Sequence, residues 1–120
     1  MITVKATREG LLGGKTASGF VIDTVVPFVA LPSVKALGSF VRVTNPRNGQ
    51  TALAIVLDVG PWNEHDDAYV FGNGAVRPAA ESGLDTRGRV TNAAGIDLGE
   101  RVWHQLGMTD NAQVAWEFLV

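Results

Sequence analysis

The feature that most constrains this chain is an apolar run that ends in a carboxylate and a sharp turn. Residues 51–61 read TALAIVLDVGP. A near-continuous apolar run of this length is typical of a strand buried on both faces, and Gly-Pro after it turns the chain. Asp58 is then placed at the rim of a sheet. Because a charge is costly to bury unless it is paired or hydrogen-bonded, Asp58 is the first candidate for chemistry.

Length and composition predict one folded domain over residues 1–120, with hydrophobic residues at 46% and charged residues at 18%. Fourteen Gly and five Pro favour a β-rich fold with many turns. The absence of Cys excludes disulfides and Cys-ligated metals. The net charge of -2 argues against a nucleic-acid partner.

No part of the sequence predicts a membrane span or an export signal. No apolar run approaches the roughly 18 residues that a spanning helix needs. The first ten residues, MITVKATREG, lack the apolar region of a signal peptide. We therefore expect no membrane-spanning segment in this chain.

Alternating and apolar runs predict five to seven short strands, which favours a small β-barrel. Asn48-Gly49 is a hairpin signal between two of these runs. The predicted strands cover residues 2–7, 20–22, 25–30, 40–44, 51–58 and 113–120. Trp103 and Trp116 are expected to pack in the core or at a barrel end.

One short helix is predicted from Asp97 to Leu106, because Leu98, Val102 and Leu106 repeat on one face. Asp97 suits the N-cap, and Glu100 follows three residues later as in a capping box. His104 is expected on the helix surface. The preceding residues, about 61–94, predict a long irregular loop, and loops of this length are usually functional or mobile.

Several short motifs occur together in this order: KTASG at 15–19, LGSFVRVTN at 37–45, DVGP at 58–61, IDLG at 96–99 and LGM at 106–108. The set resembles the double-psi β-barrel domain of the rare lipoprotein A and expansin-like family, over about residues 6–108. The related barrels include expansins, barwin and the barrel domain of membrane-bound lytic transglycosylase A. The long 61–94 loop is similar to that of phage or prophage-type variants. This resemblance implies a mainly β fold: a six-stranded double-psi β-barrel with one short α-helix and a long irregular loop.

The resemblance implies action on peptidoglycan glycan strands at the bacterial cell wall or in the periplasm, as a lytic transglycosylase or like an expansin, and without a cofactor. The family's essential Asp falls on Asp58, and the Asp of the second motif falls on Asp97. One departure concerns catalysis. A functional His of the family stands thirteen residues before the Asn that aligns with Asn45, and Pro32 occupies that position here.

Asp58 has two interpretations. As an acid/base it would protonate a glycosidic oxygen and then accept the proton of the muramic acid 6-hydroxyl, which closes a 1,6-anhydro ring. Flanking Leu57 and Val59 would raise its pKa by desolvation. As a turn residue it would instead accept backbone N–H bonds. Asp97 is either a helix cap or a supporting group of the same site.

Five further residues are candidates for substrate binding. Trp62 and Tyr69 either stack on sugar rings or anchor the long loop. Thr16 and Ser18 either hydrogen-bond a glycan or form a Gly-flanked turn. His65 either replaces the missing His or belongs to a solvated loop. The spacing of His65-Asp66-Asp67 argues against a metal site.

Three functional classes stay open on the sequence. The first is a cell-wall glycan-acting protein with Asp58 at its centre. The second is a non-catalytic phage or prophage barrel module that binds glycan or a protein partner. The third is a barwin-like or protease-inhibitor barrel that acts by binding, against which the absence of Cys argues. The sequence makes no prediction of oligomeric state.

Overall fold

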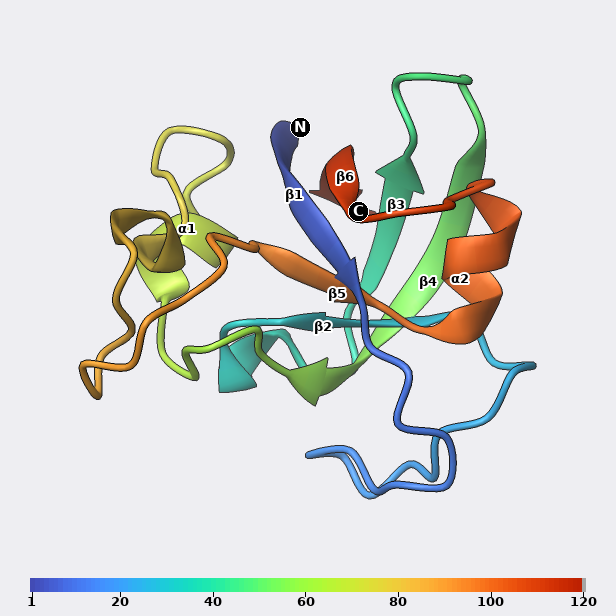
Figure 1. Ribbon diagram of the computed structural model, residues 1–120, viewed down its shortest axis with the longest axis horizontal. Coiled ribbons are helices and arrows are strands. Elements are labelled where there is room, and N and C mark those ends of the chain that lie inside the picture. Colours follow the sequence, from blue (N-terminus) through green and yellow to red (C-terminus); the bar gives the residue numbers. More distant parts are fainter. Residues whose placement is uncertain (120) are drawn as a thin grey trace.

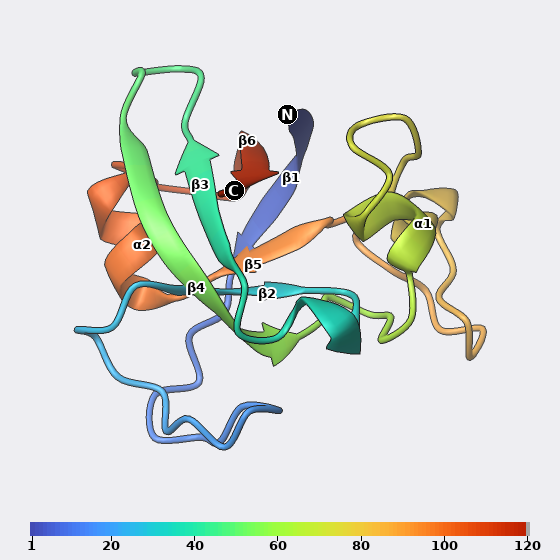
Figure 2. The same cartoon turned by 180° about the vertical axis from the view of Figure 1, so that it is seen from behind.

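The computed structural model describes residues 1–119, and its centre is a closed barrel of six strands (Figures 1 and 2). The strands are β1 (Ile2–Arg8), β2 (Phe28–Leu31), β3 (Phe40–Thr44), β4 (Thr51–Val59), β5 (Ile96–Leu98) and β6 (Ala112–Phe118). Around the barrel their order is β1-β5-β2-β4-β3-β6. The pairs β1–β5 and β2–β4 are parallel, and the other four pairs are antiparallel. The predicted mainly β, six-stranded barrel is confirmed.

Four short helical segments accompany the barrel, where the sequence predicted one helix. They are the 3-10 helices η1 (Val34–Ala36) and η2 (Ala79–Ser82) and the α-helices α1 (Asp67–Val70) and α2 (Glu100–Gln105). α1 and η2 interrupt the predicted 61–94 loop, and each is too short to show an apolar period in the sequence. α1 and α2 lie on opposite sides of the barrel in both views (Figures 1 and 2). No helix within residues 1–119 combines the length and apolarity that crossing a membrane requires.

The barrel is filled by inward-facing aliphatic side chains, among them the fully buried Val4, Val41, Val43, Val56 and Val114. Trp103 and Trp116 are also buried, as predicted, and the His104 side chain is 69% exposed, as predicted. The expectation that 51–58 is buried on both faces is wrong. Its side chains alternate, and Leu53 is 56% exposed. A barrel wall has an inner and an outer face, so a strand in it buries alternate residues only.

The C-terminal helix begins later than the sequence predicted, and Asp97 does not cap it. The helix runs from Glu100 to Gln105, and its N-cap is Gly99. Asp97 lies in β5, which pairs with both β1 and β2. Two ladders of backbone hydrogen bonds outweigh the local helical pattern here. Instead of closing a capping box, the Glu100 carboxylate accepts bonds of 2.7 and 2.6 Å from Arg8.

Two other predicted strands are shorter than expected. Residues 20–22 contribute only an isolated bridge between Val21 and Lys15. Residues 25–30 begin with a turn in which the Asp23 carboxylate accepts the N–H groups of Val25 and Val26, so β2 starts at Phe28. The hairpin at Asn48-Gly49 joins β3 to β4 as predicted. The result is a loop from about 9 to 27 that projects from the barrel (Figure 1).

Candidate functional site

The two aspartates singled out in the sequence lie on either side of Ala30. In register, Ala30 of β2 is opposite Asp58 of β4 and opposite Asp97 of β5, which in turn is opposite Thr7 of β1. A register irregularity between Val29 and Ala30 adjusts the β2–β4 pairing at this point. Residues paired in register point to the same face of a sheet. Four adjacent strands therefore bring Asp58, Asp97 and Thr7 onto one face.

Asp58 is held by backbone amides through one of its oxygens. Its Oδ1 accepts 2.9 Å hydrogen bonds from the N–H groups of Val59 and Ala17. The Ala17 bond comes from the loop after β1, which is also fastened by a 3.3 Å bond from the Ser18 N–H to the Leu57 carbonyl. These bonds are the turn contacts that the sequence left open as an alternative, and they fix the direction of the carboxylate.

Asp97 is a largely buried carboxyl beside another acid. Burial raises the pKa of Asp97 to about 6, with the charge of Asp58 adding to the rise and a hydrogen bond from the Thr7 hydroxyl opposing it. A carboxyl with this pKa exchanges protons close to neutral pH, as a general acid or base must.

Glu9 is the site residue that sequence reasoning missed. Its backbone N–H donates to the Leu98 carbonyl at 2.9 Å, which places it just beyond β1 and beside β5. Its Oε2 atom is buried and has no hydrogen-bond partner within residues 1–119. Burial first, then the neighbouring Asp58 and Asp97 carboxyl groups, raise the pKa of Glu9 to about 9. Glu9 therefore carries a proton at neutral pH.

The sequence did contain a signal for Glu9. It stands two residues after Thr7, and positions i and i+2 of an extended chain point to the same side. Once β1 is paired with β5, Glu9 and Thr7 both face the two aspartates. The signal is weak because Arg8 ends the strand and Gly10 follows, so the segment resembles an ordinary surface turn.

The loop over Asp58 also contains Thr16 and Ser18. Their hydroxyl groups are 2.9 Å apart, Thr16 is buried and Ser18 is exposed. The Ala17 N–H between them contacts Asp58. The loop thus brings both predicted hydroxyls close to the carboxyl cluster, while their bond to each other is the turn arrangement that the sequence left as the alternative.

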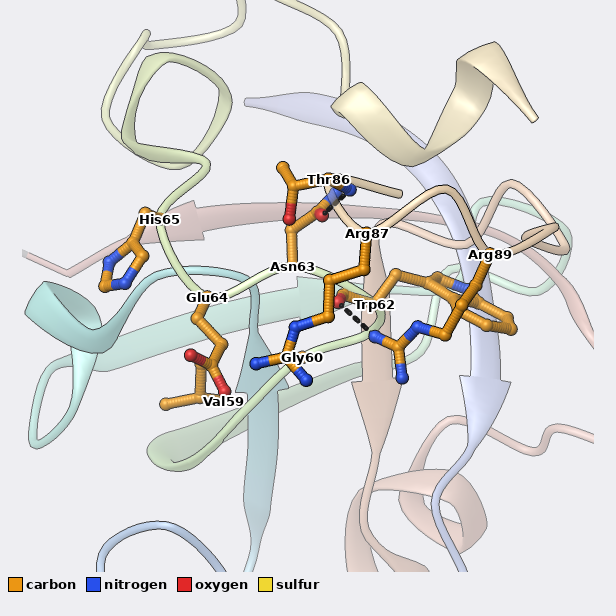
Figure 3. A pocket seen from close by; sticks show the side chains of 9 residues that line it. All are labelled: Val59, Gly60, Trp62, Asn63, Glu64, His65, Thr86, Arg87 and Arg89. Carbon is orange, nitrogen blue, oxygen red and sulfur yellow. Dashed lines mark hydrogen bonds between the residues drawn. The ribbon is translucent and has the colours of Figure 1, made fainter. Parts of the chain in front are cut away.

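A cavity of about 570 Å³ lies beyond the end of β4 (Figure 3). Its lining residues are Val59, Gly60, Trp62, Asn63, Glu64, His65, Thr86, Arg87 and Arg89. The carboxyl cluster of Glu9, Asp58 and Asp97 does not line this cavity. Gly60 does line it, and a Cβ atom at Gly60 would lie 3.8 Å from Asp97 Oδ2. The cavity and the carboxyl cluster are therefore neighbours, separated by one glycine.

The three aromatic and histidine candidates have different positions. Trp62 and His65 line the cavity. His65 also pairs with Ser33 in an isolated bridge. It therefore lies in space beside the residue that follows Pro32, the position where the resemblance implies a His. Tyr69 is 1% exposed, and its hydroxyl donates to the Gly95 carbonyl and accepts from Trp116 Nε1, each at 2.8 Å. Tyr69 anchors the long segment in the core, so its ring is not available to a ligand at the surface.

A metal ion has no ready site in this part of the molecule. Within residues 1–119, no three or more His, Asp or Glu side chains form a group that could hold one. The chemistry that the cluster can perform is proton transfer between carboxyl groups and a bound molecule.

Two solved structures share this fold. Cerato-platanin 3 from M. perniciosa superposes with a TM-score of 0.56 at 10% identity, over 99% of this chain and 95% of that one. The Streptomyces papain inhibitor superposes with a TM-score of 0.52 at 18% identity, over 96% of this chain and 92% of that one. At these identities the likeness shows the fold alone, and it supports the predicted double-psi, expansin-like barrel. The phage or prophage-type variant is a finer prediction that the likeness does not address.

The chain belongs to a family described as a domain of unknown function, DUF8814, whose model matches residues 1–117. No curated protein sequence matches the chain significantly. The family description carries no activity.

Proposed function

We propose that the protein acts on the glycan strands of peptidoglycan in the manner of a lytic transglycosylase, with Asp58 as the acid/base. The observation that carries the proposal is the convergence of three carboxyl groups, Asp58 and Asp97 on both sides of Ala30 and Glu9 beside Asp58. Such convergence raises pKa values and retains protons at neutral pH, which is the condition for general acid catalysis.

The reaction needs one proton, which is given and then recovered. Asp58 passes a proton of the carboxyl cluster to the glycosidic oxygen, and the bond from that oxygen to C1 breaks. The 6-hydroxyl of the same sugar then bonds to C1, and its proton returns to the carboxylate as the 1,6-anhydro ring closes. Asp97, with its pKa near 6, supports the cluster as a second proton carrier.

His65 supplies the imidazole that the resemblance leads us to expect at Pro32. Its bridge with Ser33 brings the long segment alongside the residue next to Pro32. The Val34 N–H bonds to the Glu64 carbonyl at 2.9 Å and the Asp66 N–H to the Pro32 carbonyl at 2.8 Å, so His65 is held from both sides. In this proposal His65 binds the glycan beside the carboxyl cluster.

The test is digestion of purified peptidoglycan, analysed by mass spectrometry. The wild-type protein should release anhydro-muropeptides, and Asp58→Asn should release at least about 100-fold less, as expected when a general acid is removed. Asp110→Asn, a change at an exposed aspartate in the turn before β6, is the matched control and should be fully active. Absence of product from folded wild-type protein, or equal product from Asp58→Asn, would contradict the proposal.

A second candidate function is binding to a protein partner, with no reaction. The loop after β1 exposes four apolar side chains, Leu11, Leu12, Val21 and Val25, between 52% and 73% exposed. Clustered exposed apolar residues often mark an interaction surface. Because one of the fold's neighbours is a papain inhibitor, the direct assay is inhibition of papain by wild-type protein and by Leu11→Ser. Inhibition that is lost in Leu11→Ser would favour this binding function over the enzymatic one.

A further inference from the structure

We infer that the cavity beyond β4 is a binding subsite for a sugar that carries a carboxylate. The inference rests on the proposed function only in taking a saccharide as the ligand. It adds the chemical class of the bound unit and the residues that select it. The cavity is lined mostly by the 61–94 segment, with Val59 at the end of β4 and Gly60 completing it.

The positive charge that a carboxylate needs comes from Arg87. Its side chain extends over the cavity toward Gly60 (Figure 3), and within residues 1–119 it forms no ion pair. Arg89, by contrast, is neutralised by the Asp85 carboxylate at 2.5 Å. A guanidinium presents paired N–H donors that match the two oxygens of a carboxylate. Arg87 is therefore the free cation of this cavity.

Asp85 holds the turn that presents Arg87. Its buried carboxylate accepts the N–H groups of Arg87 and Arg89 at 2.9 and 2.8 Å. Burial acts to raise the pKa of Asp85, but the bonds from the backbone and side chain of Arg89 and from the backbone of Arg87 outweigh it, and the net shift is downward. The carboxylate stays ionised, and the Arg87 backbone is fixed before any ligand arrives, which reduces the ordering cost of binding.

Asn63 supplies an unused donor at the same cavity. It is 2% exposed, and its Oδ1 accepts the Thr86 N–H at 3.0 Å. Its Nδ2 has no hydrogen-bond partner in the described part of the chain. A buried donor without an acceptor costs free energy, and an oxygen of a ligand offsets that cost. Arg87 supplies the positive charge that attracts an anionic group, and Asn63 supplies a donor for an oxygen of the ligand.

Trp62 and the remaining lining groups suit a saccharide rather than a simple anion. Trp62 has φ 72, a backbone conformation that bulky residues rarely adopt and that is often found at functional sites. Its indole N–H is fixed by Asn92 Oδ1 at 2.9 Å, so the ring is oriented. An aromatic face packs against a sugar ring, while Glu64, His65 and Thr86 offer partners for hydroxyl groups. The volume of about 570 Å³ falls within the range of small-molecule sites.

The experiment compares two sugars that differ by one carboxylate-bearing group. N-acetylmuramic acid is N-acetylglucosamine with a lactyl ether, so the pair measures the contribution of that group, and Arg87→Gln isolates the part that depends on charge. Each is titrated into isotope-labelled protein, and binding is followed by NMR at the Trp62 indole N–H and the backbone amides of Thr86 and Arg87. D-lactate is the third probe, because it has the carboxylate without the sugar.

The expected result is that N-acetylmuramic acid binds at least about tenfold more tightly than either other probe, a ratio typical of one hydrogen-bonded charge. Arg87→Gln should remove that preference, and Glu64→Gln should increase it by removing a negative charge from the cavity. Arg101→Gln, a change at an exposed arginine on α2, is the matched control and should leave the preference intact.

Three results would overturn the inference: equal binding of the two sugars, a preference that persists in Arg87→Gln, or lactate binding as tightly as the sugar acid. The test also separates this inference from the proposed function. Asp58→Asn should still bind N-acetylmuramic acid in the cavity, because Asp58 does not line it. Loss of digestion with intact binding leaves the subsite standing, whereas digestion without Arg87-dependent binding refutes the subsite alone.

Discussion

Glu9 shows how a carboxyl group gains its properties from residues far away in the sequence. Alone, it would be an ordinary acid in a turn after a strand. Its neighbours Asp58 and Asp97 come from β4 and from β5, and they act on it together with burial. Two charged carboxylates in contact are costly, so one member of such a cluster retains a proton. In this molecule that member is Glu9.

Substituting Glu9→Gln should make stability less dependent on pH. The pKa of Glu9 rises from its ordinary 4.5 to about 9 on folding. The protonated form of Glu9 therefore makes its full contribution to stability below pH 4.5, and this contribution is lost as the pH rises toward 9. The free energy of unfolding of the wild type falls across this range. At pH 8 the variant should be more stable by on the order of 2 kcal/mol, after a discount for solvent screening.

Chemical denaturation at pH 5 and at pH 8 measures this difference. Glu64→Gln, at an exposed glutamate, is the control and should follow the wild type at both values. A wild-type protein that is as stable at pH 8 as at pH 5 would show that Glu9 does not retain its proton.

At the scale of single residues, the sequence singled out the two aspartates as candidates, while their surroundings depend on the fold. Asp58 was singled out because a carboxylate at the end of an apolar run is rare, and Asp97 because it matches the Asp of the second motif of the resemblance. Of the two alternatives for Tyr69, stacking on sugar at the surface and anchoring the long loop, the structure shows the second, because the ring lies in the core. An aromatic side chain in a long loop can fill a space that exists only in the folded barrel. Burial of this kind depends on distant contacts and leaves no local pattern.

At the scale of secondary structure, the strands with strong local patterns were predicted best. β3 and β4 alternate and are joined by an Asn-Gly turn, so both were found nearly to the residue. β5 was mistaken for the first turn of a helix, because its three residues, Ile96–Leu98, have no period of their own. Its extended form comes from pairing with β1 and β2, which the sequence does not display.

The junction between β5 and α2 depends on close packing at Gly99. A Cβ atom there would lie 2.4 Å from Phe28 Cε1, closer than atoms can pack. We expect Gly99→Ala to destabilise the protein by about 1–3 kcal/mol, the usual cost of overpacking a core. Thermal or chemical denaturation measures this cost.

The companion experiment is a double-mutant cycle with Phe28→Leu, which shortens the opposing side chain. The double variant should lose less stability than the sum of the two single variants, because the shorter side chain relieves the clash. Strictly additive effects would mean that Gly99 is required for another reason.

At the scale of the whole molecule, the Tyr69 hydroxyl makes two of the hydrogen bonds that join the long 61–94 segment to the barrel. This one group connects Gly95 before β5 with Trp116 in β6. Tyr69→Phe would leave a buried carbonyl and a buried indole N–H without a partner. We expect a loss of about 1–3 kcal/mol in the free energy of unfolding.

Urea denaturation followed by tryptophan fluorescence measures this loss. Thr24→Val deletes an exposed hydroxyl and should change stability by less than about 0.5 kcal/mol. A Tyr69→Phe variant as stable as this control would mean that the segment's other contacts, including its backbone bonds to Pro32 and Val34, hold it to the barrel without this hydroxyl.

The barrel as a whole was predictable as a class, and its strand order was not. Many short strands, frequent turns and the ordered motifs together indicate a small barrel. The order β1-β5-β2-β4-β3-β6 depends on which edges meet in space, and the parallel pairs join strands separated by long stretches of sequence. The Asp58–Ala30–Asp97 row follows from that order, so it could be found only after the fold was known.

The position of β6 has a consequence for how the protein forms during synthesis. β6 pairs with both β1 and β3 and thereby closes the barrel, yet it is the last of the six barrel strands to be translated. Until residues 112–118 emerge, every carboxyl group of the site has been translated, while β1 and β3 still have open edges. A nascent chain stalled before that point should bind chaperones that recognise exposed strands, and the finished site should appear only once residues 112–118 have emerged.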